Sequence, residues 1–265
     1  MTLRIPFTAL QLLSAAIVAC AFIAGPRAAL AQTAPGTDFV ILKPVTANAQ
    51  PQQLANVLIV GVRGTKVTIR NAQGEIGQEL SQIQEVRKAA PPEFAQGQRA
   101  IEEGKLDEAL TLIRGVTERY KGLPVVWASD ATATLGNLFI SLGRLPEAET
   151  AFDEFQKYYP GAGSLAGSVG KARIAAERGK YAEARAAVEP LVKDALTKKD
   201  VSRAESQLYG QAFYVLGKVA EGEGKLPEAM ENYCRTVAIF YQERAVVAAA
   251  EKRIEALRQK GITTP

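Results

Sequence analysis

Gly104-Lys-Leu-Asp-Glu-Ala109 decides the fold, because this stretch returns three times in the 265 residues of the chain. The later copies are Gly143-Arg-Leu-Pro-Glu-Ala148, Gly179-Lys-Tyr-Ala-Glu-Ala184 and Gly224-Lys-Leu-Pro-Glu-Ala229. A large residue follows the Ala of each copy by four positions, and a small residue precedes each Gly by seven. The large residues are Ile113, Phe152, Val188 and Tyr233, and the small ones are Gly97, Gly136, Ala172 and Gly217. Since glycine ends helices and permits a tight turn, each copy predicts two helices joined by a short turn.

Four such units resemble the tetratricopeptide repeat (TPR), a helix–turn–helix unit of about 34 residues. The resemblance covers about residues 93–241, although the glycine-to-glycine spacings here are 39, 36 and 45 residues. It implies a mainly α fold, an α-solenoid of about four units over 91–241. The helical spacing of apolar residues in 242–260 predicts a terminal helix, so we assign 242–265 to a capping helix and tail. The Gly-rich run 161–170 precedes the third unit's turn, and we interpret it as a flexible helix entry.

Residues 32–90 have a different period and form a separate module with a linker. Val67 and Ile69 alternate with polar residues, and further Val-, Ile- and Leu-rich stretches lie at 38–44, 55–62 and 75–86. Turn signals separate these stretches. The pattern predicts a small antiparallel β module of four or five strands, either an open sheet or an SH3-like or Sm-like barrel. Pro91-Pro92 marks its boundary with the helical units.

Residues 1–31 have the pattern of a secretory signal peptide. Arg4 precedes an apolar stretch at 7–24, and Ala29-Leu-Ala31 supplies the small residues of a cleavage site, so we expect cleavage after Ala31. An alternative is lipidation at Cys20, because Ile17-Val-Ala-Cys20 resembles a bacterial lipobox. Membrane association is expected only in that second case, and the chain is otherwise expected to be periplasmic or exported.

The composition argues against catalysis. The chain has no His and two Cys, which removes the commonest general base, the triads that depend on it and most zinc sites. Paired carboxylates such as Glu102 and Glu103 are adjacent, so they diverge on a helix. With 32 Lys+Arg against 28 Asp+Glu there is no basic patch for nucleic acid. We therefore expect no enzyme activity, no cofactor, no metal site and no nucleic-acid partner.

The TPR resemblance implies that the first helix of each unit lines a concave groove that holds peptides or helices of other proteins. The residue after each small packing residue should point into this groove, which selects Gln98, Asn137, Arg173 and Lys218. Tyr214 lies one helical turn before Lys218, and Ile140 one turn after Asn137. This combination of apolar and hydrogen-bond-donating side chains suits an extended peptide with an acidic group. The alternative is that these are ordinary solvated helix residues.

The leading interpretation is a non-enzymatic scaffold of the bacterial cell envelope that binds a segment of another envelope protein in its groove. A signal peptide followed by TPR units is also loosely similar to envelope proteins such as the Tol-Pal coordinator family, but 32–90 lacks the heptads of that family's coiled coil. One alternative is a self-assembling structural protein that forms homo-oligomers through the β module or the terminal helix. Another is an accessory subunit of an envelope enzyme complex.

Overall fold

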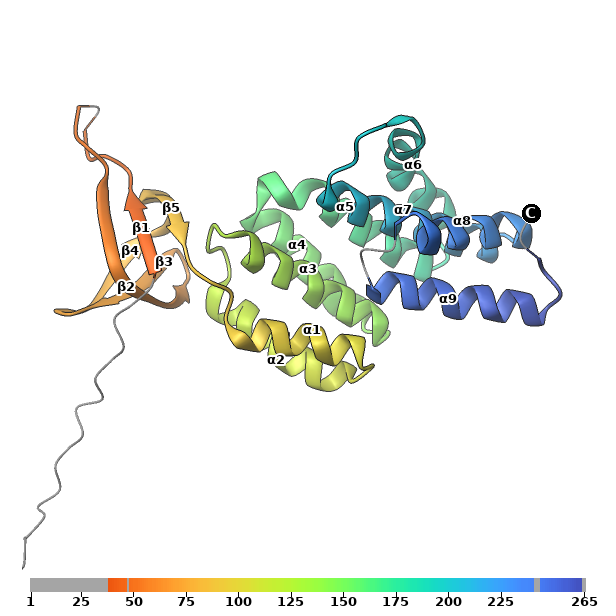
Figure 1. Ribbon diagram of the computed structural model, residues 1–265, viewed down its shortest axis with the longest axis horizontal. Coiled ribbons are helices and arrows are strands. Elements are labelled where there is room, and N and C mark those ends of the chain that lie inside the picture. The colour runs from red at the N-terminus through yellow and green to blue at the C-terminus, as the bar shows by residue number, and fades with distance from the viewer. Residues whose placement is uncertain (1–37, 47, 241–243, 264–265) are drawn as a thin grey trace, which may run out of the picture. The chain divides into compact units, whose positions relative to one another are not determined.

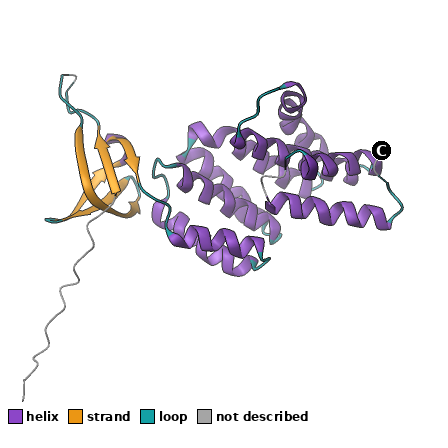
Figure 2. Cartoon of the chain, viewed as in Figure 1, coloured by secondary structure: helices purple, strands orange, loops and turns teal. Residues whose placement is uncertain are grey.

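The computed structural model describes residues 38–46, 48–240 and 244–263. The predicted signal peptide, the lipidation candidate Cys20 and the cleavage site at Ala31 lie outside these ranges. Strands precede helices along the described chain, as Figure 2 shows by colour. The fold is mainly α, with an antiparallel β module before the helical units, as the sequence predicts.

The β module is a five-stranded antiparallel sheet with the order β4-β3-β2-β1-β5. Its strands are β1 (Asp38–Leu42), β2 (Gln52–Arg63), β3 (Lys66–Asn71), β4 (Gly74–Glu79) and β5 (Ile83–Arg87). The predicted stretch 75–86 is two strands, because the short 3-10 helix η1 (Leu80–Gln82) divides it. Val67 and Ile69 are fully buried on one face of β3, so the predicted alternation is confirmed.

Strand β2 is shared between two halves of this sheet. Its first half pairs with β1, up to the partners Asp38 and Val57, and its second half pairs with β3 from Leu58 onward. Asn56 lies near the end of the first half with a φ of 55°, in the left-handed region that Asn tolerates better than most residues. A register shift between β1 and β2 accompanies this conformation. The resulting bend lets the module enclose a small core although it has only five short strands.

Paired helices follow the sheet (Figure 1). The first helices of the four units are α1 (Pro92–Glu102), α3 (Val126–Ser141), α5 (Pro160–Glu177) and α7 (Arg203–Gly222). The second helices are α2 (Leu106–Tyr120), α4 (Leu145–Tyr158), α6 (Tyr181–Thr197) and α8 (Leu226–Ala238), and α9 (Arg244–Gln259) follows them. Each first helix contacts the second helix of its unit, and each second helix contacts the next first helix. Within the described ranges, no helix is both long and apolar enough to cross a membrane.

Every repeat glycine ends its first helix in the same way. Gly104, Gly143, Gly179 and Gly224 have φ values of 72–77°. The N–H of each glycine bonds to the carbonyl three residues before it, and the next N–H bonds to the carbonyl five residues before, as in Gly104 to Ile101 and Lys105 to Ala100. These two bonds are the Schellman motif, which satisfies carbonyls that the end of the helix leaves free. The repeated sequence therefore encodes the turn directly.

The small residues let the two helices of a unit come close together. A Cβ atom built on Gly136 would lie 2.7 Å from the Phe152 ring, and one on Gly217 would lie 2.5 Å from the Tyr233 ring. Phe152 is enclosed from a second side, because a Cβ on Gly170 of α5 would lie 2.3 Å from the same ring. The Gly-rich run predicted as a flexible helix entry is thus part of α5, and at Gly170 it serves close packing between units.

A buried ion pair joins β1 to the segment after β5, where the β module meets the helices of the same compact unit. Lys88 Nζ lies 2.9 Å from Asp38 Oδ2, with side-chain exposures of 9% and 5%, and Asp38 also accepts a hydrogen bond from the Ile59 N–H. The Trp127 indole of α3 donates to the Lys88 carbonyl at 2.8 Å and stacks edge-on against Tyr120 of α2. The ion pair fixes Lys88 on the module, and the contacts of Lys88 with Trp127 and Tyr120 hold the module to the first units.

The packing at Gly136 leads to a prediction about stability. Gly136→Ala should lower the free energy of unfolding by about 1–3 kcal/mol, because the added methyl overpacks the site against Phe152. Gly115→Ala is the matched control, since a Cβ at this exposed position of α2 meets nothing within 4 Å. The control should raise the stability by about 0.5–1 kcal/mol through helix propensity. Urea unfolding followed by circular dichroism tests both, and equal effects of the two substitutions would contradict the packing argument.

Candidate functional site

The predicted groove residues of α3, α5 and α7 lie next to one another. Arg173 of α5 donates from Nη1 to Asn137 Oδ1 of α3 at 3.0 Å. On its other side, the Arg173 guanidinium carbon lies 5.4 Å from the centroid of the Tyr214 ring of α7. This distance is within the range of a cation–π contact. The side chain of Arg173 thus connects three consecutive units across the face of their first helices.

Arg173 is unusual because its charge is buried without a carboxylate partner. The residue is only 7% exposed, and its Nε has no hydrogen-bond partner among the described residues. None of the described carboxylates forms an ion pair with it. Burying a charge costs several kcal/mol unless ionic or hydrogen-bonding partners compensate it. Asn137 and Tyr214 supply part of that compensation, and the remaining donor capacity favours binding of an anionic group.

The other predicted groove residues are arranged differently. Lys218 forms an ion pair with Glu177 of α5 at 3.2 Å, so its charge is already compensated. Ile140 and Tyr214 are each 6% exposed and contribute to the packing of their helices. Gln98 of α1 is exposed and forms no described hydrogen bond with Asn137, Arg173 or Tyr214. Sequence reasoning missed Glu177, although its position one turn after Arg173 places it on the same helix face.

Helix α9 borders this region and is fixed by a second polar group. Glu221 of α7 accepts a hydrogen bond from the Tyr233 hydroxyl at 2.9 Å and one from Arg253 Nε of α9 at 2.9 Å, with a further short contact to Arg253 Nη2. Burial and the adjacent Glu221 carboxylate raise the pKa of Tyr233, and the hydrogen bond to Glu221 raises the pKa of Arg253. Helix α9 also contacts α1, so the two ends of the described array meet.

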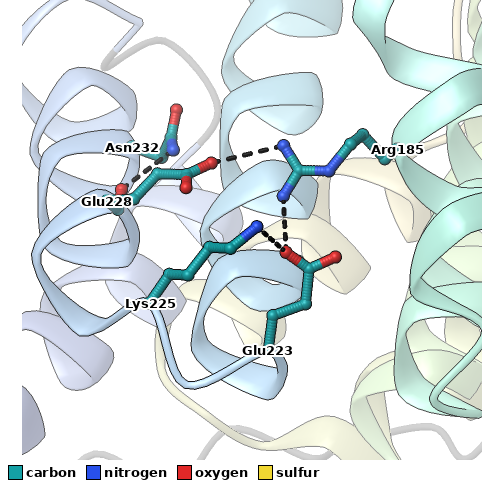
Figure 3. A network of polar contacts seen from close by, with 5 residues as sticks. All are labelled: Arg185, Glu223, Lys225, Glu228 and Asn232. Carbon is teal, nitrogen blue, oxygen red and sulfur yellow. Dashed lines mark hydrogen bonds and ion pairs between the residues drawn. The ribbon is translucent and has the colours of Figure 1, made fainter.

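The third and fourth units are joined by a more exposed network on the side of the turns (Figure 3). Arg185 of α6 contacts Glu223 at 2.9 Å and Glu228 at 3.2 Å, and Lys225 shares Glu223 at 2.8 Å. The amide of Asn232 donates to the Glu228 carbonyl. The hydrogen bond from Lys225 lowers the pKa of Glu223. This network fixes one unit to the next.

The comparisons with known proteins agree with this architecture. The tetratricopeptide-repeat family model matches three overlapping segments, residues 94–163, 133–189 and 169–252. Together they span more than half of the 265 residues. This chain belongs to the tetratricopeptide-repeat family. The resemblance that the four glycine turns indicated is therefore confirmed.

Two solved structures resemble this TPR chain, both at 18% sequence identity and with a TM-score of 0.36. They are MamA 41-end from Desulfovibrio magneticus RS-1 and the ArsTM double mutant of MamA RS-1. Each alignment covers 65% of this chain and 98% of the other. No curated protein matches the sequence.

The family and the fold support a protein-interaction scaffold as the general role. Among the described residues, no cluster of three or more His, Cys, Asp or Glu side chains is placed to hold a metal ion. The Arg173 group is the candidate binding feature on the first helices. Its contacts come from first helices, which in this family line the surface on which partners bind.

The Glu221 group leads to a prediction about α9. Glu221→Gln removes the charge that pairs with Arg253, so the free energy of unfolding should fall by about 1–2 kcal/mol, allowing for the partial exposure of Arg253. Hydrogen exchange of the α9 amides should quicken more than that of α3. Glu255→Gln, which changes an exposed carboxylate of α9, is the control and should leave exchange unchanged. Equal exchange in both variants would show that the Glu221–Arg253 contact does not hold α9.

Proposed function

We propose that this chain is an exported scaffold of the bacterial cell envelope that binds an acidic segment of a partner protein. The binding surface is the face of α3, α5 and α7 around Arg173. The observation that carries the proposal is the buried guanidinium of Arg173, which has a free Nε–H and no described carboxylate partner. The TPR scaffold role indicates that the partner is a protein, and the unpaired positive charge indicates that the bound segment is acidic.

The contacts around Arg173 favour one carboxylate over a diffuse acidic patch. The amide of Asn137 holds Nη1, and the ring of Tyr214 covers one face of the guanidinium. These contacts fix the orientation of the planar group before a ligand arrives, which lowers the entropic cost of binding. Lys218 is paired with Glu177, so it adds less to the attraction than its charge alone would suggest.

Capture of the partner from cells tests this site. Arg173→Gln should reduce the amount of crosslinked envelope partner about 10-fold or more, since a hydrogen bond to a charged group contributes about 1.5–3 kcal/mol. Arg178→Gln is the matched control, because Arg178 lies on the same segment but pairs with the exposed Glu149. Arg173→Lys keeps the charge and should retain part of the binding. All variants are first compared by circular dichroism.

Each result of this capture has a definite meaning. Loss of the partner in Arg173→Gln and in the triple variant Asn137→Ala, Arg173→Ala, Lys218→Ala, with retention in Arg178→Gln, supports the proposal. Capture of the same partner by every variant would refute the Arg173 site. Capture of the chain alone would favour self-assembly through the β module or α9.

Export is tested separately by the N-terminus of the protein that cells accumulate. We expect mass spectrometry of the periplasmic fraction to find a chain that begins at Gln32, because small residues at positions 29 and 31 suit cleavage after Ala31. A membrane-bound chain that begins at a lipid-modified Cys20 would instead support the alternative, a lipoprotein anchored in the membrane. A chain that still begins at Met1 in the cytoplasm would contradict the envelope assignment while leaving the Arg173 site intact.

A further inference from the structure

A second candidate binding site lies away from the Arg173 face, between the second helices α2 and α4. A cavity of about 220 Å³ opens there, with Leu135 and Phe139 of α3 as its floor. Its walls comprise Arg114, Thr117, Glu118 and Lys121 of α2, and Glu147, Thr150, Ala151 and Glu154 of α4. The cavity is thus apolar at its base and polar at its rim.

Thr117 of α2 has a buried hydroxyl group that the packing of α2, α3 and α4 leaves without a partner. It is 3% exposed, and its hydroxyl oxygen has no hydrogen-bond partner among the described residues. Other helical threonines of this chain donate to a carbonyl four residues earlier, as Thr111 does to Asp107 and Thr132 to Ala128. A buried hydroxyl without a partner costs about 1–3 kcal/mol. The Thr117 hydroxyl is therefore a hydrogen-bond donor and acceptor to which another group could bind.

The charges at the rim largely cancel. Lys121 pairs with Glu154 at 2.8 Å, and Arg144 pairs with Glu147 at 2.7 Å. The Arg114 and Arg144 guanidinium carbons lie 5.4 and 5.0 Å from the Phe139 ring centroid, so cations cover this ring at the mouth. An uncharged occupant fits this rim better than an ionised one, and an aromatic ring can stack beside Arg114.

The size of the cavity limits what can enter it. Pockets for drug-sized ligands begin at about 300 Å³, so a cavity of about 220 Å³ accommodates one large side chain. We propose that it receives a tyrosine side chain of a partner protein, with the ring on Leu135 and Phe139 and the phenol hydroxyl bonded to Thr117. Tyrosine combines an apolar body with one polar end, and it is common where interfaces are anchored. Threonine in a helix populates two χ1 rotamers, so the Thr117 hydroxyl turns towards the occupant at little cost.

This inference does not depend on the Arg173 site. The cavity is formed by α2, α3 and α4 of the first two units, whereas the Arg173 group is formed by other residues of α3 together with α5 and α7. A partner that uses both would contact the array on two sides. Loss of one site would leave the other measurable.

The test uses p-cresol, which reproduces the tyrosine side chain, and toluene, which lacks the hydroxyl. Each probe is titrated into the protein in the form that cells accumulate, and binding is followed by backbone amide chemical shifts. We expect p-cresol to shift the amides of Thr117, Leu135 and Phe139 and to bind several-fold more tightly than toluene. Thr117→Val should abolish the difference between the probes, and Ala151→Leu should weaken both by filling the cavity.

Thr111→Val is the matched control, because this exposed threonine of α2 lies outside the cavity. Thr117→Val should also leave the melting temperature unchanged or raise it, since it removes an unpaired buried hydroxyl. Absence of p-cresol shifts at these amides would overturn the proposal, as would equal binding of both probes to the parent protein. A lower melting temperature of Thr117→Val without p-cresol binding would show that water satisfies the hydroxyl and would likewise overturn it.

Discussion

The helices of each unit pack at a point where a small residue of the first helix faces a large side chain of the second. At Gly136 and Gly217 the aromatic ring of the second helix lies so near that even a methyl group would collide with it. This spacing fixes the angle and distance between the helices, and the Schellman turn sets the direction in which the second helix leaves. The placement of every functional side chain on the first helices depends on this contact, because it determines which face of the helix remains outside the unit.

Since this packing contact recurs from unit to unit, what is particular to this chain lies in its ionic groups. Most charged side chains near the first helices are neutralised within the array, as Lys218 is by Glu177 and Arg253 by Glu221. The Asp38–Lys88 pair follows the same principle between β1 and the segment after β5. Arg173 departs from it, because its burial is compensated only by an amide and an aromatic ring. Because Lys218 and Arg253 are paired and the buried Arg173 is not, that departure is the strongest indication of a ligand.

The sequence could predict the parts of the fold that local residue patterns encode. The four glycine turns, the helix-starting prolines 146 and 227, and the alternation around Val67 each have a short-range physical cause, and the structure contains all of them. The pairing of Lys218 with Glu177 was not predicted, because it depends on how two units are rotated against each other. The cavity beside Thr117 was missed for a similar reason, since it is formed by residues of three helices. The run 161–170 does begin a helix, as predicted, but its composition could not show that Gly170 packs closely against Phe152.

Helix α9 ends with the same turn as the first helices of the units. Its end repeats the Schellman bonds, with Gly261 at a φ of 81° and Ile262 bonded to the Leu257 carbonyl, so it is built like a first helix. Seven residues before Gly261, where the other units have Gly or Ala, stands Ile254, which is 7% exposed. Ile262 packs against the cluster that contains this side chain. One helix turn thus places Arg253 on Glu221 and Ile254 in the core, so α9 is held by an ion pair and by apolar packing.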